Sequence, residues 1–338
     1  MITQQYKEII QETEVKGEPV LKVEGLKKYF YPKKSIGEEQ KVVKAVENVS
    51  FDLYKGETLG IVGESGCGKS TMGRSLLRLI EPTEGKVFLE GNDITNLNIN
   101  DLRKARKNIQ MVFQDPYSSL NPRLRIGNIL EESLKIQGIG NKNERTERVL
   151  EMLNLVGLNE AQYYRFPHEF SGGQRQRIGL ARALIVNPKV VVCDEPVSAL
   201  DVSVQAQIIN LLRNLQNTLS VSFIFIAHDI SVVRHISDRI GVMYLGHLVE
   251  EATTEELFAN PKHPYTKSLL SAVPLPNPEV KKDRIILKGD LPSPMNPPSG
   301  CVFHTRCPMA MDICKSVLPQ RTKVSNSHVV RCHLNESE

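Results

Sequence analysis

A glycine-rich segment at residues 63–70 constrains this chain more than any other feature of its sequence. Its residues, GESGCGKS, fit the pattern G-x-x-x-x-G-K-[ST] without a mismatch. The apolar run at 58–62 indicates a buried strand directly before it, and residues 71–77 indicate the start of a helix. Strand, loop and helix thus come in the order that a phosphate-binding loop requires. A plain glycine-rich turn ahead of a helix is the alternative.

The chemistry of this loop predicts a nucleotide site. Glycines let the backbone turn so that successive N–H groups face phosphate oxygens, and the helix N-terminus adds partial positive charge. Lys69 is expected to reach the β- and γ-phosphates, and the Ser70 hydroxyl is expected to bind Mg²⁺. The predicted ATP-binding residues of the loop are Gly63, Ser65, Gly66, Cys67, Gly68, Lys69, Ser70 and Thr71.

Composition excludes several classes of protein. The chain has 338 residues, of which 40% are hydrophobic, enough for the cores of two or three globular domains. Its net charge of +4, from 43 basic and 39 acidic residues, is too mild to indicate a nucleic acid partner. No apolar run approaches the ~20 residues that span a bilayer, and the polar residues 1–5 do not resemble a signal peptide. We therefore expect a cytoplasmic protein.

Several apolar strands are predicted to deliver polar side chains to the γ-phosphate. One strand ends at Gln114, whose amide oxygen can ligate Mg²⁺, and another ends at Asp194 and Glu195. Asp194 is expected in the second shell of Mg²⁺, and Glu195 beside the water in line with the γ-phosphate. A third strand ends at His228, which can touch the γ-phosphate. Each of these residues has a plain alternative. Gln114 can be an ordinary loop residue, Asp194 and Glu195 can be acidic turn residues, and His228 can be a structural or solvated histidine.

Three consecutive aromatic residues, Tyr29, Phe30 and Tyr31, follow a strand predicted at 20–24 from its alternating apolar and polar residues. One of them can stack on an adenine ring, and we expect Phe30 to do so. Packing at the edge of a sheet is the alternative for all three.

A helical period runs from 126 to about 164 and predicts a helical subdomain, placed at about 120–180, inserted into an α/β core. Ser171 follows and can cap the next helix. The N-terminus of that helix is therefore a second predicted site for binding an anion. Two anion cradles in one chain are needed only if two chains share the nucleotide. The residues of this second cradle are Ser171, Gly172, Gly173 and Gln174.

Together these segments have the order and approximate spacing of ABC-type ATPases, which the chain resembles from about Val20 to Glu250. Within that family it is similar to the ATP-binding subunits of di- and oligopeptide importers, close to their second, F-type ATPase. The segments behind this narrower resemblance are QDPYSSLNPR at 114–123, EPVSALDVSV at 195–204 and HPYTKSLL at 263–270. Phe170 departs from the family pattern, which usually has leucine there.

The resemblance implies an α/β P-loop NTPase fold: an ABC-type core with an antiparallel β subdomain and an inserted helical subdomain, plus a small C-terminal cysteine-containing extension. It implies two nucleotide-binding domains facing head to tail. Residues 171–174, which form the signature of one chain, then close over the ATP of the other chain. Asp201 then lies in the D-loop, Glu195 is the general base or orients the water, His228 senses the γ-phosphate, and Gln114 links Mg²⁺ to the membrane subunits.

The implied partners are a second ATPase subunit in a heterodimer, two membrane permease subunits and, indirectly, an extracellular peptide-binding protein. The chain is then expected at the cytoplasmic face of the cell membrane. The predicted domains are an N-terminal arm at 1–19, the nucleotide-binding domain at 20–255 and the C-terminal extension at 256–338.

Four of the six cysteines crowd into the last forty residues, as Cys301-x5-Cys307-x6-Cys314-x17-Cys332. In a reducing compartment this clustering favours a metal site over disulfides. Spacing does not choose between Zn²⁺ and a [4Fe–4S] cluster, and the other possible ligands are His304, His328 and His333. The resemblance favours [4Fe–4S]. Buried thiols without any metal are the alternative.

Other functions remain open from the sequence. The chain can serve an importer of nickel or another solute, or act as an ABC ATPase on DNA or ribosomes. The latter would normally bring a long coiled coil or a second ATPase cassette, and the sequence has neither. An iron–sulfur electron carrier would leave the ATPase residues unexplained.

Overall fold

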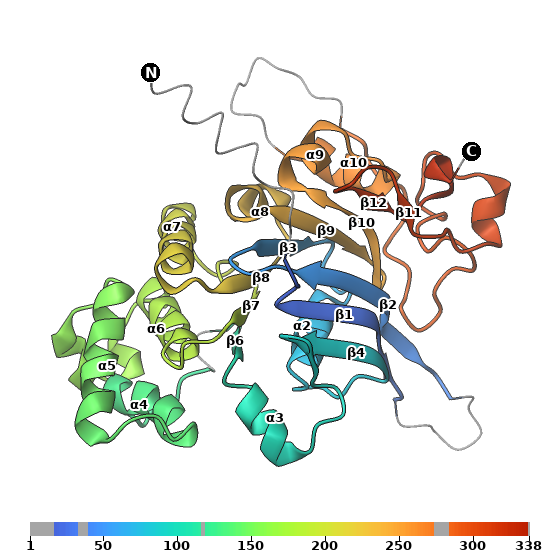
Figure 1. Ribbon diagram of the computed structural model, residues 1–338. Coiled ribbons are helices and arrows are strands. Elements are labelled where there is room, and N and C mark those ends of the chain that lie inside the picture. The colour runs from blue at the N-terminus through green and yellow to red at the C-terminus, as the bar shows by residue number, and fades with distance from the viewer. Residues whose placement is uncertain (1–16, 33–39, 116–118, 274–283, 337–338) are drawn as a thin grey trace.

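The computed structural model describes residues 17–32, 40–115, 119–273 and 284–336 (Figure 1). Most of the predicted N-terminal arm and residues 116–118 of the loop after Gln114 lie outside these ranges.

The larger of two sheets forms the centre of the molecule. Its strands follow the order β11-β12-β10-β9-β3-β8-β7-β6, and the five from β9 to β6 run parallel. The strands of this sheet are β3 (Thr58–Val62), β6 (Ile109–Val112), β7 (Val190–Asp194), β8 (Ser222–Ala227), β9 (Arg239–Tyr244), β10 (His247–Thr253), β11 (Thr322–Lys323) and β12 (Val329–Val330).

Both faces of the parallel strands are buried, which is why they read as continuous apolar runs. Successive side chains point to opposite faces. In β7, Val190 and Val192 join one apolar core, while Val191 and Cys193 join the other. The parallel order also brings the carboxyl ends of β3, β6, β7 and β8 to one edge of the sheet.

An antiparallel sheet packs over one face of the central sheet, with α2 between them (Figure 1). Met72 and Leu76 of α2 pack in the same core as Val87 of the small sheet and Ile224 of the large one. The predicted antiparallel β subdomain is thus confirmed. Its strands, in the order β2-β1-β4-β5, are β1 (Leu21–Phe30), β2 (Val43–Leu53), β4 (Glu84–Leu89) and β5 (Asn92–Asp93).

The predicted helical segment at 126–164 is confirmed as α4, α5 and a short 3₁₀ helix. It stands apart from the antiparallel sheet, beyond β6 and β7 (Figure 1). None of the described helices combines the length and apolar content needed to cross a bilayer. The α-helices are α2 (Lys69–Leu76), α3 (Ile99–Ala105), α4 (Ile126–Ile136), α5 (Lys142–Leu155), α6 (Gly172–Leu184), α7 (Val202–Leu219), α8 (Ile230–Ile236), α9 (Thr254–Ala259) and α10 (Pro264–Ser271), and the 3₁₀ helices are Glu160–Tyr164, Pro167–Glu169, Asp312–Lys315 and His333–Asn335.

The C-terminal region packs closely on the core. β12 pairs with β10, with Val330 opposite Glu250, so the region extends the central sheet. Phe303 packs edge-on against Tyr244 of β9 at 5.1 Å between ring centroids. The division at residue 255 stays a prediction.

A buried histidine joins this region to β10 and α9. The Nε2 of His328 lies 2.7 Å from a carboxylate oxygen of Glu250, and its Nδ1 lies 3.3 Å from one of Glu256. Burial alone lowers the pKa of His328, but the hydrogen bond and charge of Glu250, together with Glu256, outweigh it and raise the pKa above its ordinary 6.5. The charged form of His328 therefore stabilises the attachment of the C-terminal region to β10 and α9. This stabilisation is full below about pH 6.5 and is lost as the pH rises through the raised pKa of His328.

We therefore expect protease to cut the C-terminal region faster as pH rises from 6 towards 9, measured by mass spectrometry of the fragments. His328→Gln should remove this pH dependence, whereas the control His304→Gln should keep it. A wild-type chain whose C-terminal region is equally protected at both ends of this range would contradict the role of His328.

Candidate active site

The glycine-rich loop turns tightly between β3 and α2 because two of its glycines occupy positions that exclude a side chain. Gly68 has φ +105°, and a Cβ there would lie 2.0 Å from the carbonyl oxygen of Ala45. A Cβ on Gly63 would lie 2.1 Å from the carbonyl oxygen of Met243. Helix α2 begins without a side-chain cap or an acidic residue in its first turn. Its N-terminus is therefore open to an anion.

The two polar side chains that end the loop are held by neighbours. The buried ammonium of Lys69 donates to the carbonyl oxygens of Gly63 at 2.7 Å and Glu64 at 3.0 Å. The Ser70 hydroxyl donates to Oδ1 of Asp194 at 2.7 Å. The other carboxylate oxygen, Oδ2, is buried and makes no hydrogen bond within the described chain, although Arg74 lies 3.7 Å away. Burial raises the pKa of Asp194, against the opposing effect of Ser70 and Arg74.

The polar residues predicted at strand ends meet beside this loop. The amide Nε2 of Gln114 donates to Oε2 of Glu195 at 2.8 Å, and Nδ1 of His228 lies 3.9 Å from the same oxygen. Glu195 has φ +46°, a strained conformation for a non-glycine residue and one that is common at functional sites. Nothing in the residues around Glu195 predicts this strain.

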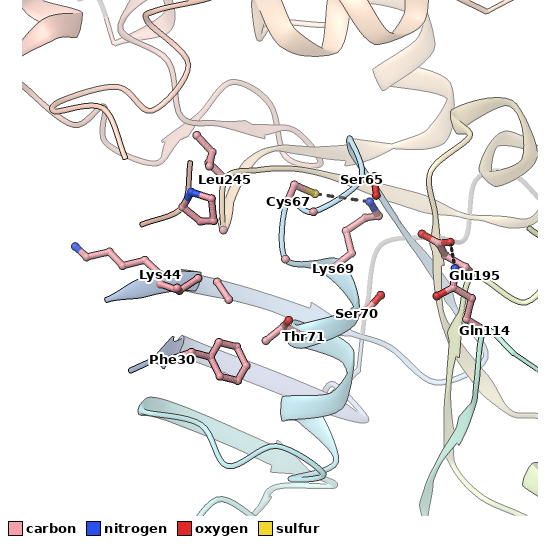
Figure 2. A pocket seen from close by; sticks show the side chains of 16 residues that line it. Phe30, Lys44, Ser65, Cys67, Lys69, Ser70, Thr71, Gln114, Glu195 and Leu245 are labelled. Atoms are coloured by element: carbon pink, nitrogen blue, oxygen red, sulfur yellow. Dashed lines mark hydrogen bonds between the residues drawn. The ribbon is translucent and has the colours of Figure 1, made fainter. Parts of the chain in front are cut away.

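The loop forms the floor of a cleft of about 360 Å³. Figure 2 shows Gln114 and Glu195 on one side of Lys69 and Ser70, and Phe30 on the other side. The residues that line the cleft are Phe30, Val43, Lys44, Ala45, Ser65, Gly66, Cys67, Gly68, Lys69, Ser70, Thr71, Gln114, Glu195, Leu245, Gly246 and Pro294.

Of the three candidate aromatic residues, Phe30 lines the cleft and is 38% exposed. The hydroxyl of Tyr29 instead donates to Glu47 at 2.6 Å. Tyr31 is 59% exposed and is not among the residues that line the cleft. The geometry thus favours Phe30 as the ring beside a nucleobase.

The second predicted cradle lies elsewhere on the chain. The hydroxyl of Ser171 accepts from the N–H of Gln174 at 3.4 Å and caps α6, while the Gln174 amide accepts from the N–H of Ser171 at 3.0 Å. The residues 171–174 line a separate cavity of about 730 Å³ together with Asp201. The chain therefore does not bring its own two cradles together.

Sequence reasoning missed several residues around the loop. Tyr265 of α10 accepts a hydrogen bond from the N–H of Glu64 at 2.9 Å, and Arg306 binds the Glu64 carboxylate at 2.9 Å. Pro294, which lines the cleft, accepts from the N–H of Lys44 at 3.2 Å. No spacing rule links positions so far apart in the sequence.

The prediction of a [4Fe–4S] cluster is wrong, as is the zinc alternative. Throughout 17–32, 40–115, 119–273 and 284–336, no group of three or more His, Cys, Asp or Glu side chains is arranged to hold a metal ion. Burial raises the pKa of Cys301 and Cys332 to about 11 and also raises that of Cys307. Burial thus disfavours the thiolate, which is the form that binds a metal. Cys301 and Cys314 instead pack in an apolar core with Val302 and Phe303.

Two family models match the chain. The model "ABC transporter" matches residues 46–198, and "Oligopeptide/dipeptide transporter, C-terminal region" matches residues 249–314. The oligopeptide transport ATP-binding protein AppF of Bacillus subtilis (strain 168) is 56% identical over 327 residues, which cover 95% of this chain and 99% of AppF. The dipeptide transport ATP-binding protein DppF of Haemophilus influenzae (strain ATCC 51907 / DSM 11121 / KW20 / Rd) is 51% identical over 314 residues, covering 93% and 96%.

A similar solved structure is the dimeric post-hydrolysis state of the ATP-binding cassette MJ0796 bound to ADP and Pi. It is 33% identical with a TM-score of 0.61, over 69% of this chain and 98% of that one. The predicted ABC-type ATPase fold is confirmed. Fold, cleft and sequence relatives agree, and the chain belongs to the ATP-binding subunits of oligopeptide and dipeptide ABC transporters.

Proposed function

We propose that this chain hydrolyses ATP to energise the import of di- or oligopeptides through two membrane permease subunits. The observation that carries the proposal is the cleft in which the phosphate loop, Gln114 and Glu195 meet. The family supplies the transport role. Its C-terminal model and the names of AppF and DppF favour peptides as the solute over nickel.

Within the cleft, Lys69 and the backbone N–H groups of the loop bind the phosphates, and Phe30 stacks on the adenine. Mg²⁺ fits the residues present. Asp194 keeps a buried oxygen without a hydrogen bond among the described residues, and its other oxygen accepts from the Ser70 hydroxyl. Ser70 and Gln114 both line the cleft, and such oxygen donors suit Mg²⁺. When bound, Mg²⁺ neutralises the charge that develops on the phosphates.

Glu195 holds the attacking water and accepts its proton, because its carboxylate lies at the cleft between Gln114 and His228. His228 then senses the γ-phosphate. The signature residues 171–174 and Asp201 line a separate cavity, and in a head-to-tail heterodimer they serve the nucleotide of a second ATPase subunit. A binding protein outside the cell delivers the peptide to the permeases.

We expect this chain to attach to membranes only in cells that also express its two permease subunits. Washed membranes from cells with and without the permeases should be compared by immunoblotting. In the same cells, uptake of a labelled oligopeptide should depend on this chain. Attachment without permeases would contradict the coupling role, since the chain would then reach the bilayer by itself. If uptake of labelled Ni²⁺ depends on the chain and peptide uptake does not, nickel and not peptide would be the transported solute.

A further inference from the structure

The C-terminal region contacts the phosphate loop through Arg306. Its Nη1 donates to both carboxylate oxygens of Glu64, at 3.0 and 2.9 Å. The Arg306 side chain is 11% exposed and that of Glu64 29%, so water shields the pair only weakly. Charge-assisted hydrogen bonds in such partly buried positions are stronger than exposed ion pairs.

Every polar group of Glu64 is held by a neighbour. Its N–H donates to the hydroxyl of Tyr265 at 2.9 Å, and its carbonyl oxygen accepts from the ammonium of Lys69 at 3.0 Å. Tyr265 is fully buried and packs against Phe303 at 5.4 Å between ring centroids. Phe303 lies three residues before Arg306, so the same short C-terminal segment supports two of the three contacts of Glu64.

These contacts bear on the lysine that binds phosphate. The Lys69 ammonium rests on the carbonyl oxygens of Gly63 and Glu64, and it must turn from them towards a bound phosphate. The position of Glu64 therefore sets the starting point of Lys69 and the path of the loop backbone.

We propose that Arg306 is a positioning residue of the nucleotide site, which fixes Glu64 and so preorganises the phosphate loop. Docking of the C-terminal region and binding of MgATP are then linked, and each strengthens the other by the same factor. A second contact supports this linkage at the nucleobase end, where Pro294 lines the cleft and accepts from the N–H of Lys44. The inference rests on the proposed nucleotide site.

Arg306→Met should weaken MgATP binding to the full-length chain about tenfold, the effect of losing one charge-assisted pair that shapes the site. Isothermal titration calorimetry measures the Kd. Arg321→Met is the matched control, because Arg321 also joins the C-terminal region to the core, at 3.0 Å from Glu251, but lies away from the nucleotide cleft. It should leave the Kd unchanged. MgATP should also protect the C-terminal region from protease in the wild type, and about tenfold less in Arg306→Met.

A second variant separates positioning from a general loosening of the C-terminal region. Glu64→Gln removes the same pair from the loop side and leaves Arg306 in place. It should weaken MgATP binding as Arg306→Met does, and the double variant should be no weaker than either single one. Arg306→Lys, which keeps the charge, should recover part of the affinity.

Three results would overturn the inference: a Kd for Arg306→Met within twofold of the wild type, an equal loss in Arg321→Met, or single effects that simply multiply in the double variant. A wild-type chain that does not bind MgATP would instead contradict the proposed function.

Discussion

Replacing Glu195 with glutamine is expected to leave a chain that binds MgATP but hydrolyses it about 10²–10⁴-fold more slowly, the usual cost of losing a catalytic base. The amide has nearly the size of the carboxylate and can still accept the hydrogen bond that Gln114 donates at 2.8 Å. The phosphate loop is untouched, because Lys69 and Ser70 do not bond to Glu195. Phosphate release by the complete transporter and the Kd for MgATP are the two measurements.

The control for this variant is Glu151→Gln, which makes the same chemical change at an exposed position on α5, outside the residues that line the cleft. It should hydrolyse ATP at the wild-type rate. With hydrolysis blocked, the Glu195→Gln chain should collect ATP in a closed dimer, seen by size-exclusion chromatography with its partner ATPase. Near wild-type turnover in Glu195→Gln would remove the residue from the catalytic role.

The parts of the site that the sequence predicts are those formed by adjacent residues. The geometry of the loop from Gly63 to Ser70 depends on local backbone rules, so the pattern alone specifies it. The strand ends at Gln114, Asp194 and His228 follow almost as directly, because parallel strands deliver their carboxyl ends to one edge. At these strand ends, the backbone strain at Glu195 is the feature that only the structure reveals.

The sequence does not predict which of the three aromatic rings faces the cleft. The register between β1 and β2 shifts between Lys28 and Tyr29, and each such shift changes the face to which a side chain points. Simple alternation therefore does not distinguish Phe30 from Tyr29 or Tyr31.

The sequence also does not predict contacts between distant segments, as the C-terminal region illustrates. Arg306 and Glu64 are 242 residues apart, and neither stands out in its own segment. The prediction of a metal site at the four C-terminal cysteines failed for a related reason. Their spacing indicated how many thiols lie near one another in sequence, but the protonation that burial favours depends on tertiary packing.

A carboxylate at the N-terminus of α6 should disable the nucleotide site of the partner ATPase. A Cβ at Gly172 would meet nothing closer than Leu200, at 3.6 Å, so Gly172→Asp fits without strain. In the proposed head-to-tail dimer its charge faces the γ-phosphate of the partner's ATP. Two like charges ~4 Å apart repel by ~4 kcal/mol at an effective dielectric constant of about 20, or about 10³-fold in rate or affinity. ATP hydrolysis by the complete transporter should fall accordingly.

The neutral variant Gly172→Asn separates charge from size, because asparagine has almost the shape of aspartate. It should retain most of the hydrolysis that Gly172→Asp loses, and both variants, as isolated chains, should bind MgATP with the wild-type Kd. Equal losses in the two variants would mean that bulk, and not charge, disturbs the site. A weaker Kd in the isolated Gly172→Asp chain would contradict the head-to-tail arrangement, since α6 would then act on the nucleotide of its own chain.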